Sequence, residues 1–301
     1  MNKSPLVSII MNCYNGEKYL HQALDSIVSQ TYQNWELIFW DNQSTDDSKN
    51  IFDSYQDSRL KYYYAENHTM LYEARNYATN KASGEFLAFL DVDDTWELDK
   101  LEKQLPLFDN EMVGLVYGNY VVRDEMTSSQ HLMFDKILPS EWVVDSLLDD
   151  YVVGLLTIMV RRKAFDSLEK QFDSRFHIIG DFDFVLRIST HWKFDCIQES
   201  VANYRQHGNN ESIKHRDKFI EESLTWYSEM RYHSEFSEKE EIYRKYNLFL
   251  YHDAILRKIE GNQIKTVFSI LTMLPLGVLK LKLLIIIFLP KFLKNKLAYV
   301  K

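Results

Sequence analysis

Asp91, Asp93 and Asp94 place three carboxylates directly after an apolar run from Phe86 to Leu90. The run is apolar without alternation, which is typical of a strand buried in a parallel sheet. Its end would lie at the carboxyl edge of that sheet, where open α/β folds bind ligands. Crowded carboxylates repel one another unless a cation lies among them. Oxygen ligands of this kind suit Mg²⁺ or Mn²⁺, which in turn would hold a diphosphate.

The same aspartates also fit the start of a helix. Asp93 or Asp94 could cap a helix that begins near Trp96, because aspartate is a favoured residue at that position. The local sequence does not separate a metal site from a helix cap, so the rest of the chain has to decide.

Short apolar runs alternate with helix-like stretches over the first 110 residues. The predicted strands there are residues 6–11, 35–40, 60–64 and 85–90, and the predicted helices are residues 17–29, 45–54 and 70–81. This alternation predicts a parallel sheet with right-handed crossovers. Further along, the pattern predicts a strand pair at 113–122 interrupted near Gly118, strands at 155–160 and 200–205, and a helix at 181–189.

Charge and cysteine content bound the class of protein. The chain has 301 residues and a net charge of −9, and residues 1–260 alone hold 28 basic and 44 acidic side chains. Such an acidic body argues against non-specific nucleic-acid binding. Cys13 and Cys196 have no CxxC spacing and are expected to be reduced core thiols. No signal peptide precedes the first predicted strand, so we expect a cytoplasmic body.

Residues 261–301 differ from the body, with seven lysines and no acidic residue. Pro275, Lys280 and Lys282 interrupt the apolar stretches, which counts against a membrane span of about 20 apolar residues. A membrane-surface segment fits better, with apolar side chains in the acyl boundary and lysines on anionic headgroups. The alternative is a helical hairpin packed on the body or on a partner protein.

Short motifs rich in polar residues appear in one order along the chain. They are Tyr14-Asn15-Gly16, Gln30-Thr31-Tyr32, residues 41–47, Ala74-Arg75-Asn76, Gly84-Glu85, residues 91–94, Gly180-Asp181-Phe182-Asp183 and residues 204–212. Each turn alone is a weak signal, because turns are rich in such residues for local reasons. Together, over about residues 5–212, they closely resemble the family 2 glycosyltransferases, which are inverting enzymes of the GT-A fold.

The resemblance implies an α/β protein in three parts. Residues 1–212 would form a GT-A, Rossmann-like nucleotide-binding domain with a mixed central sheet. Residues 213–260 would form a helical extension, followed by the basic apolar tail at 261–301.

The resemblance also assigns roles to residues. Those implied to line the base and ribose of a nucleotide sugar are Asn12, Tyr14, Asp41 and Asn42. Arg75 matches an arginine near the sugar diphosphate. Asp91 and Asp93 match the DxD-type motif that holds the metal, Mn²⁺ or Mg²⁺, and the donor's diphosphate or ribose. Asp181 matches the general base, and His207 would bind metal or diphosphate.

Two positions depart from the family pattern, and several have simpler explanations. Asn42 stands where a second aspartate is common, and its amide could accept from a uracil imide or face another base, so UDP is the favoured nucleotide without being fixed. Gly180 replaces a glutamate before the base. Asp181 could instead cap a helix, and Asp183 is a rival base or a buried carboxylate near Arg187. Arg75 and His207 could be a simple ion pair and a structural histidine.

These expectations combine into one reaction. Transfer from a nucleotide sugar expels a nucleoside diphosphate, whose charge a metal stabilises, while a carboxylate takes the proton of the acceptor hydroxyl. The basic tail suggests a lipid-linked glycan acceptor at the inner face of the cell membrane, and the family suggests bacterial cell-surface polysaccharide synthesis. The alternatives are a non-catalytic sugar-nucleotide-binding or scaffolding protein, and a nucleotidyltransferase. The second would need a Gly/Lys/Arg-rich loop where residues 12–16 have none.

Overall fold

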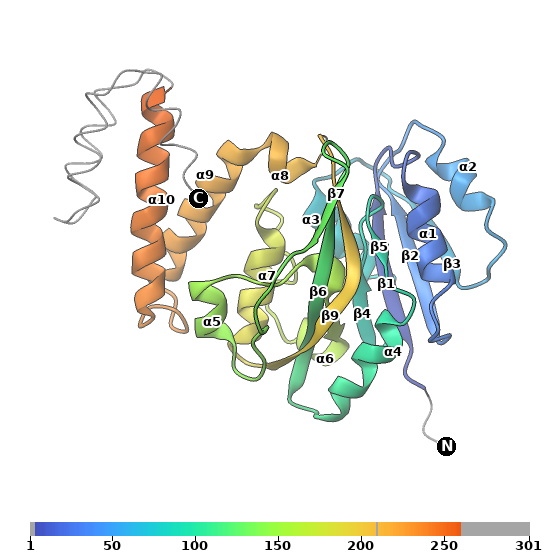
Figure 1. Ribbon diagram of the computed structural model, residues 1–301, viewed down its shortest axis with the longest axis horizontal. Coiled ribbons are helices and arrows are strands. Elements are labelled where there is room, and N and C mark those ends of the chain that lie inside the picture. Colours follow the sequence, from blue (N-terminus) through green and yellow to red (C-terminus); the bar gives the residue numbers. More distant parts are fainter. Residues whose placement is uncertain (1–3, 209, 260–301) are drawn as a thin grey trace. The chain divides into compact units, whose positions relative to one another are not determined.

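The computed structural model describes residues 4–208 and 210–259. It contains two compact units, Met1–Asn210 and Glu211–Lys301 (Figure 1). All the candidate site residues lie in the first unit. The predicted domain boundary at residue 212 stays a prediction, and the basic tail at 261–301 lies outside the described residues.

One mixed sheet organises the first unit (Figure 1). Its strands are β1 (Val7–Cys13), β2 (Trp35–Asp41), β3 (Leu60–Tyr64), β4 (Phe86–Phe89), β5 (Thr95–Trp96), β6 (Val113–Asp124), β7 (Ser129–Leu132), β8 (Met159–Arg161) and β9 (Lys193–Gln206). They are ordered β3-β2-β1-β4-β8-β6-β9-β5, and β7 pairs with β6. Strands β1 to β4 are parallel, β8 is antiparallel to both β4 and β6, and β9 is parallel to β6. The expected mixed α/β sheet is confirmed.

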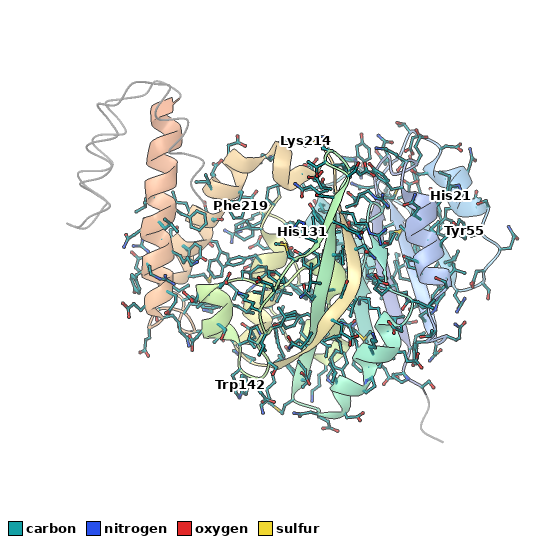
Figure 2. All side chains as sticks on the ribbon, in the orientation of Figure 1. His21, Tyr55, His131, Trp142, Lys214 and Phe219 are labelled. Carbon is teal, nitrogen blue, oxygen red and sulfur yellow. The ribbon has the colours of Figure 1, made fainter. Side chains whose placement is uncertain are left out.

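Helices and helical turns connect these strands. They are α1 (Leu20–Val28), α2 (Ser48–Asp53), α3 (Leu71–Thr79), α4 (Lys100–Gln104), η1 (Leu105–Asp109), α5 (Val144–Asp149), η2 (Leu155–Thr157), α6 (Arg162–Asp166) and α7 (Gly180–Ser189). Helix α1 buries Leu20, Ala23, Leu24 and Ile27, a helical spacing that forms one apolar stripe against the core. Figure 2 labels His21 on α1 and Tyr55 beyond α2, where the Tyr55 hydroxyl donates to Asp25 Oδ1 at 2.7 Å.

Strand direction explains why polar residues gather at one edge of the sheet. Strands β1, β2, β4, β6 and β9 all run the same way, because β8 is antiparallel to both β4 and β6. Their carboxyl ends therefore meet at one edge. Residues 12–16, 41–47, 91–94, 124–125 and 205–207 all lie there. This is the edge at which open α/β sheets bind ligands.

Three predicted elements differ from the structure. Residues 113–122 belong to the single strand β6, and the interruption expected near Gly118 is a shift of register against β9. The strand predicted at 155–160 is the helical turn η2 followed by the short β8. Strand β9 extends well before the predicted start at residue 200, because Lys193 to Gln206 pair with most of the length of β6.

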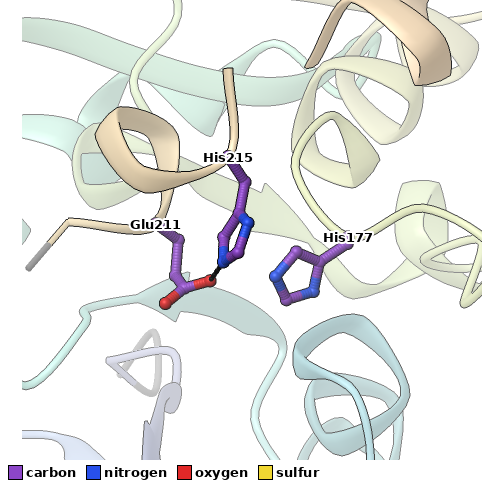
Figure 3. Close-up of side chains that lie close together, drawn as sticks. All are labelled: His177, Glu211 and His215. Carbon is purple, nitrogen blue, oxygen red and sulfur yellow. Dashed lines mark ion pairs between the residues drawn. The ribbon is translucent and has the colours of Figure 1, made fainter. Parts of the chain in front are cut away.

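The second unit is helical where the structure describes it. Its helices are α8 (Glu211–Lys214), α9 (Arg216–Met230) and α10 (Glu240–Ile259). Trp226 is fully buried, with its ring 5.6 Å from that of Phe236, so it packs in a core. Figure 3 shows the ion pair between Glu211 and His215, whose Oε2 and Nε2 atoms are 3.4 Å apart. Within the described part of the chain, no helix is long and apolar enough to cross a membrane.

Candidate active site

The three aspartates after β4 form a loop and do not cap a helix. Residues Thr95–Trp96 form strand β5, and the next helix, α4, begins only at Lys100. The helix-cap alternative is therefore wrong, because the chain after Asp94 must stay extended to pair with β9. The loop stands at the carboxyl edge of the sheet, with the Asp91 side chain 40% exposed.

Arg75 is bonded to this loop from a separate element. It is almost completely buried on α3, and its Nη2 donates to Asp91 Oδ1 at 2.6 Å. Burial lowers the pKa of Arg75, but Asp91, with smaller contributions from Tyr72 and Asp181, outweighs it and raises the pKa overall. Arg75 is thus a buried cation whose charge acts on both carboxylates, rather than a member of a surface ion pair.

Asp93 meets His207 where β4 and β9 end. His207 Nε2 lies 3.0 Å from Asp93 Oδ2, although 114 residues separate them in the sequence. Burial and the nearby Asp91 charge raise the pKa of Asp93. The predicted metal ligands Asp93 and His207 therefore do come together, while Asp91 stands beside them on Arg75.

Asp94 has a different task from its two neighbours. It is 4% exposed, and its Oδ1 accepts the backbone N–H of Arg205 at 2.8 Å. The Arg205 side chain adds a second hydrogen bond between the same segments, because its Nε donates to the Asp93 carbonyl at 2.9 Å. Burial, with the charge of Asp93, raises the pKa of Asp94 well above its usual value. Asp94 and Arg205 thus fix the aspartate loop to the end of β9.

Sequence reasoning missed two residues that lie near His207, Tyr19 and Glu125. The Tyr19 ring stacks on the His207 imidazole, with ring centroids 5.0 Å apart, and its hydroxyl donates to Glu125 Oε2 at 2.6 Å. Glu125 follows β6 and also accepts from Arg205 Nη1 at 3.1 Å. Only the position of Glu125 after a strand could have indicated its place, because the contacts join residues 80 to 106 positions apart.

Asp181 lies in the first turn of α7, two residues after the N-cap Ile179. The Tyr72 hydroxyl, 3.2 Å away, and the Phe182 N–H, 2.9 Å away, both reach its Oδ1. Among the described residues no donor is bonded to Oδ2, which is left to accept a proton. Burial raises the pKa of Asp181, while the charge of Arg75 opposes the rise. Tyr72 was missed, although it precedes Arg75 by one helical turn.

Asp183 is unsuited to be the base. It is 3% exposed and receives both Nε and Nη2 of Arg187, at 3.0 and 2.6 Å. The expectation of a buried structural carboxylate paired with Arg187 is confirmed. Both bonds go to Oδ2 of Asp183, which this ion pair commits to Arg187, so Asp181 is the better placed of the two carboxylates.

Asn12 and Tyr14 stand at the end of β1. The Asn12 side chain is 8% exposed, and neither Oδ1 nor Nδ2 has a hydrogen-bond partner among the described residues. Tyr14 is 55% exposed, with its ring centroid 4.5 Å from that of His68. A buried amide with one free donor and one free acceptor, beside an exposed ring, can receive a flat heterocycle.

Asp41 and Asn42 are engaged within the protein. Asp41 is 1% exposed, with its Oδ1 accepting the Ser44 N–H at 2.7 Å and its Oδ2 accepting the Tyr62 hydroxyl at 2.6 Å. The Asn42 amide donates to the Thr69 carbonyl at 2.8 Å and accepts the Thr69 N–H at 3.2 Å. Both side chains shape the turns around the site, and their contact with a nucleotide stays a prediction.

The residue types fit a divalent cation. Three aspartates lie together, but Arg75 pairs with Asp91 only, and the Arg205 guanidinium is directed to Glu125, Gln22 and a carbonyl. The cluster is therefore short of positive charge, and the charge of Asp91 adds to burial in raising the pKa of Asp93. Two carboxylates and an imidazole are ligand types that Mn²⁺ accepts.

The mixed sheet, with carboxylates gathered at one edge, is consistent with the GT-A fold. The family model described as Glycosyl transferase family 2 matches residues 8–168, which is more than half of the chain, and the protein belongs to this family. The assignment of a glycosyltransferase from the sequence is confirmed.

Two curated relatives illustrate the similarity. TuaG of Bacillus subtilis, named for teichuronic acid biosynthesis, is 33% identical over 172 residues, covering 56% of this chain and 67% of its own. WfgD of Escherichia coli, a UDP-Glc:α-D-GlcNAc-diphosphoundecaprenol β-1,3-glucosyltransferase, is 36% identical over 167 residues, covering 56% of this chain and 64% of its own. The similarity thus spans about two thirds of the length of these relatives.

Solved structures share the fold. Staphylococcus aureus TarS 1–349 in complex with UDP has a TM-score of 0.62 at 18% identity, covering 86% of this chain and 75% of its own. The mannosyltransferase PcManGT of Pyrobaculum calidifontis, with GDP-Man and Mn²⁺, has a TM-score of 0.62 at 14% identity, covering 99% of this chain and 85% of its own. At these identities the likeness concerns the fold alone.

Proposed function

We propose that this enzyme transfers a sugar from a nucleotide donor, with UDP-sugars favoured, to a hydroxyl of a glycan acceptor with inversion at the anomeric carbon. The observation that carries the proposal is the Asp181 carboxylate, whose Oδ2 receives no hydrogen bond from the described residues and whose charge acts on the same buried Arg75 that is bonded to Asp91. Attack from the face opposite the leaving group needs a base and a diphosphate site that are separate in this way.

In this proposal the residues divide the work. Asp181 Oδ2 takes the proton of the acceptor hydroxyl, while Tyr72 and the Phe182 N–H hold Oδ1 and so fix the carboxylate. Asp91, Asp93 and His207 would hold Mn²⁺ or Mg²⁺, which supplies charge stabilisation for the departing diphosphate. Arg75 keeps a positive charge between the two carboxylate sites.

The residues proposed to contact the base support UDP as the nucleotide of the donor. The unpaired Asn12 amide offers one donor and one acceptor, which complement a uracil edge, and Tyr14 offers an exposed ring for stacking. WfgD carries UDP-Glc in its name, and TarS has been solved with UDP. PcManGT binds GDP-Man, so the same fold accepts another base, and the donor has to be measured.

A thermal-shift screen with Mn²⁺ and UDP-, GDP-, dTDP- and CMP-sugars tests the proposal. We expect UDP-sugars to give the largest rise in Tm, because at equal concentration the donor with the lowest Kd stabilises the folded protein most. A ligand at 100 times its Kd raises the free energy of unfolding by about 2.7 kcal/mol. Asn12→Leu should reduce the shift with UDP and leave the shift with inorganic diphosphate unchanged. A larger shift with GDP-sugars would overturn the choice of UDP, and no shift with any of them would overturn donor binding.

We further propose a lipid-linked acceptor in bacterial cell-surface polysaccharide synthesis, met by a protein held peripherally at the inner face of the membrane. WfgD and TuaG support the pathway by their names, and the lysines of residues 261–301 support attraction to anionic lipid. Membrane attachment of this tail stays a prediction.

Deleting residues 264–301 tests the tail. We expect the full chain to float with vesicles that contain anionic lipid and the shortened chain to stay in solution, because the lysines and apolar side chains are lost together. An unchanged rise in Tm with UDP-sugar would show that the shortened chain is folded. Equal flotation of the two proteins would contradict a membrane role for the tail.

A further inference from the structure

A tyrosine with a buried hydroxyl packs against the residue that follows the proposed base. Tyr151 follows α5, which packs against α7, and its ring meets that of Phe182 at 5.0 Å in an edge-on arrangement. Phe182 is the residue after Asp181. The Tyr151 hydroxyl is buried, and no hydrogen-bond partner reaches it from the described residues.

Neighbouring tyrosines show how unusual this hydroxyl is. The Tyr72 hydroxyl reaches the Ile178 carbonyl at 3.0 Å and Asp181 at 3.2 Å, and the Tyr117 hydroxyl donates to the Pro139 carbonyl at 2.6 Å. Native proteins pair most buried polar groups, because an unpaired one costs stability. A phenylalanine would fill the same space at position 151 without that cost. The described residues therefore leave this hydroxyl available to a water molecule or a ligand.

The hydroxyl is held in its donor form. Burial raises the pKa of Tyr151 well above its usual value, and the negative charge of Asp181 adds to the rise. A phenol that stays protonated next to a carboxylate can donate a hydrogen bond to an oxygen that approaches the carboxylate. An acceptor sugar brings several such oxygens to the base.

We propose that Tyr151 is an acceptor-binding residue whose hydroxyl donates to an oxygen of the acceptor sugar next to the hydroxyl that Asp181 deprotonates. The inference rests on the proposed role of Asp181. In the transfer step the acceptor oxygen forms the new bond to the anomeric carbon, its proton goes to Asp181, and the nucleoside diphosphate leaves with the electron pair of the broken bond. Tyr151 gives up no proton and sets the orientation of the acceptor.

Tyr151→Phe tests this assignment, because it removes one oxygen and leaves the ring. The acceptor is supplied as detergent-extracted lipids of the source cells, and transfer of labelled sugar from a UDP-sugar into lipid is followed as the extract is diluted. We expect the half-saturating amount of extract to rise roughly three- to tenfold, the value of one neutral hydrogen bond. The Kd for the UDP-sugar should not change, and Tm should stay equal or rise.

Tyr117→Phe is the matched control, since its hydroxyl has a partner inside the protein. We expect it to lower Tm and to leave the half-saturating amount of extract unchanged. A fall in Tm with Tyr151→Phe, or an unchanged dependence on the extract, would overturn the proposal. If the wild-type protein transfers no sugar to the extract from any donor, the proposed function itself fails, which is a separate result.

Discussion

Asp181→Asn is expected to reduce sugar transfer by roughly 10²- to 10⁴-fold, the usual contribution of a general base. The substitution keeps Oδ1, so Tyr72 and the Phe182 N–H retain their acceptor and the first turn of α7 keeps its shape. It replaces Oδ2 with an amide that cannot take a proton. Single-turnover transfer measures the loss, and calorimetry with the UDP-sugar should show a Kd within a few-fold of the wild type.

Asp183→Asn gives the comparison within the same helical turn. It removes the charge that Arg187 needs in a buried pair, so we expect a lower Tm with transfer near the wild-type rate. The reverse pattern, with Asp183→Asn inactive and Asp181→Asn active, would move the base to Asp183.

The pH dependence of transfer gives a second test of Asp181 as the base. The base acts only when ionised, and burial raises the pKa of Asp181 above that of an ordinary aspartate despite the opposing charge of Arg75. Transfer should therefore rise with pH as Asp181 loses its proton and then level off. This acidic limb should be absent from the residual activity of Asp181→Asn.

The sequence predicted the parts of the site that depend on local pattern. The apolar run before Asp91 is a buried parallel strand, and the parallel strands β1, β2 and β4 bring their polar ends to one edge. Helix α7 begins at Gly180, one residue before the predicted start, and carries Asp181 in its first turn. Such features follow from periodicity and strand direction, which short segments already contain.

The features that escaped prediction depend on contacts between distant residues. Asp94 accepts from the backbone of Arg205, 111 residues away, and residues 95–96 pair with β9, so they form a strand instead of a helix. Asn42 spends one donor and one acceptor of its amide on the Thr69 backbone, a contact that its sequence position does not indicate. No local pattern carries this information, because the type of a polar residue does not indicate which distant residue it will bond in the fold.

Removing the metal is expected to have the other large effect. EDTA should abolish transfer, and Mn²⁺ should restore it better than Mg²⁺, because an imidazole ligand such as His207 suits Mn²⁺ more than the harder Mg²⁺. Asp93→Asn should raise the Kd for Mn²⁺ at least roughly tenfold, since losing even an outer partner of a metal site costs 10- to 100-fold. Paramagnetic resonance of free Mn²⁺ measures this Kd without any turnover.

The Asp94→Asn variant tests whether Asp94 is a metal ligand or only bonds the aspartate loop to Arg205. The amide keeps an oxygen that accepts the Arg205 N–H, and the raised pKa of Asp94 shows that its site favours an uncharged group. We therefore expect the Kd for Mn²⁺ to stay within a few-fold of the wild type in this variant. If Asp94→Asn weakens Mn²⁺ more than Asp93→Asn does, then Asp94 is the ligand, and its bond to Arg205 must break when the metal binds. Equal Kd values in all three proteins would instead mean that the cation is held elsewhere.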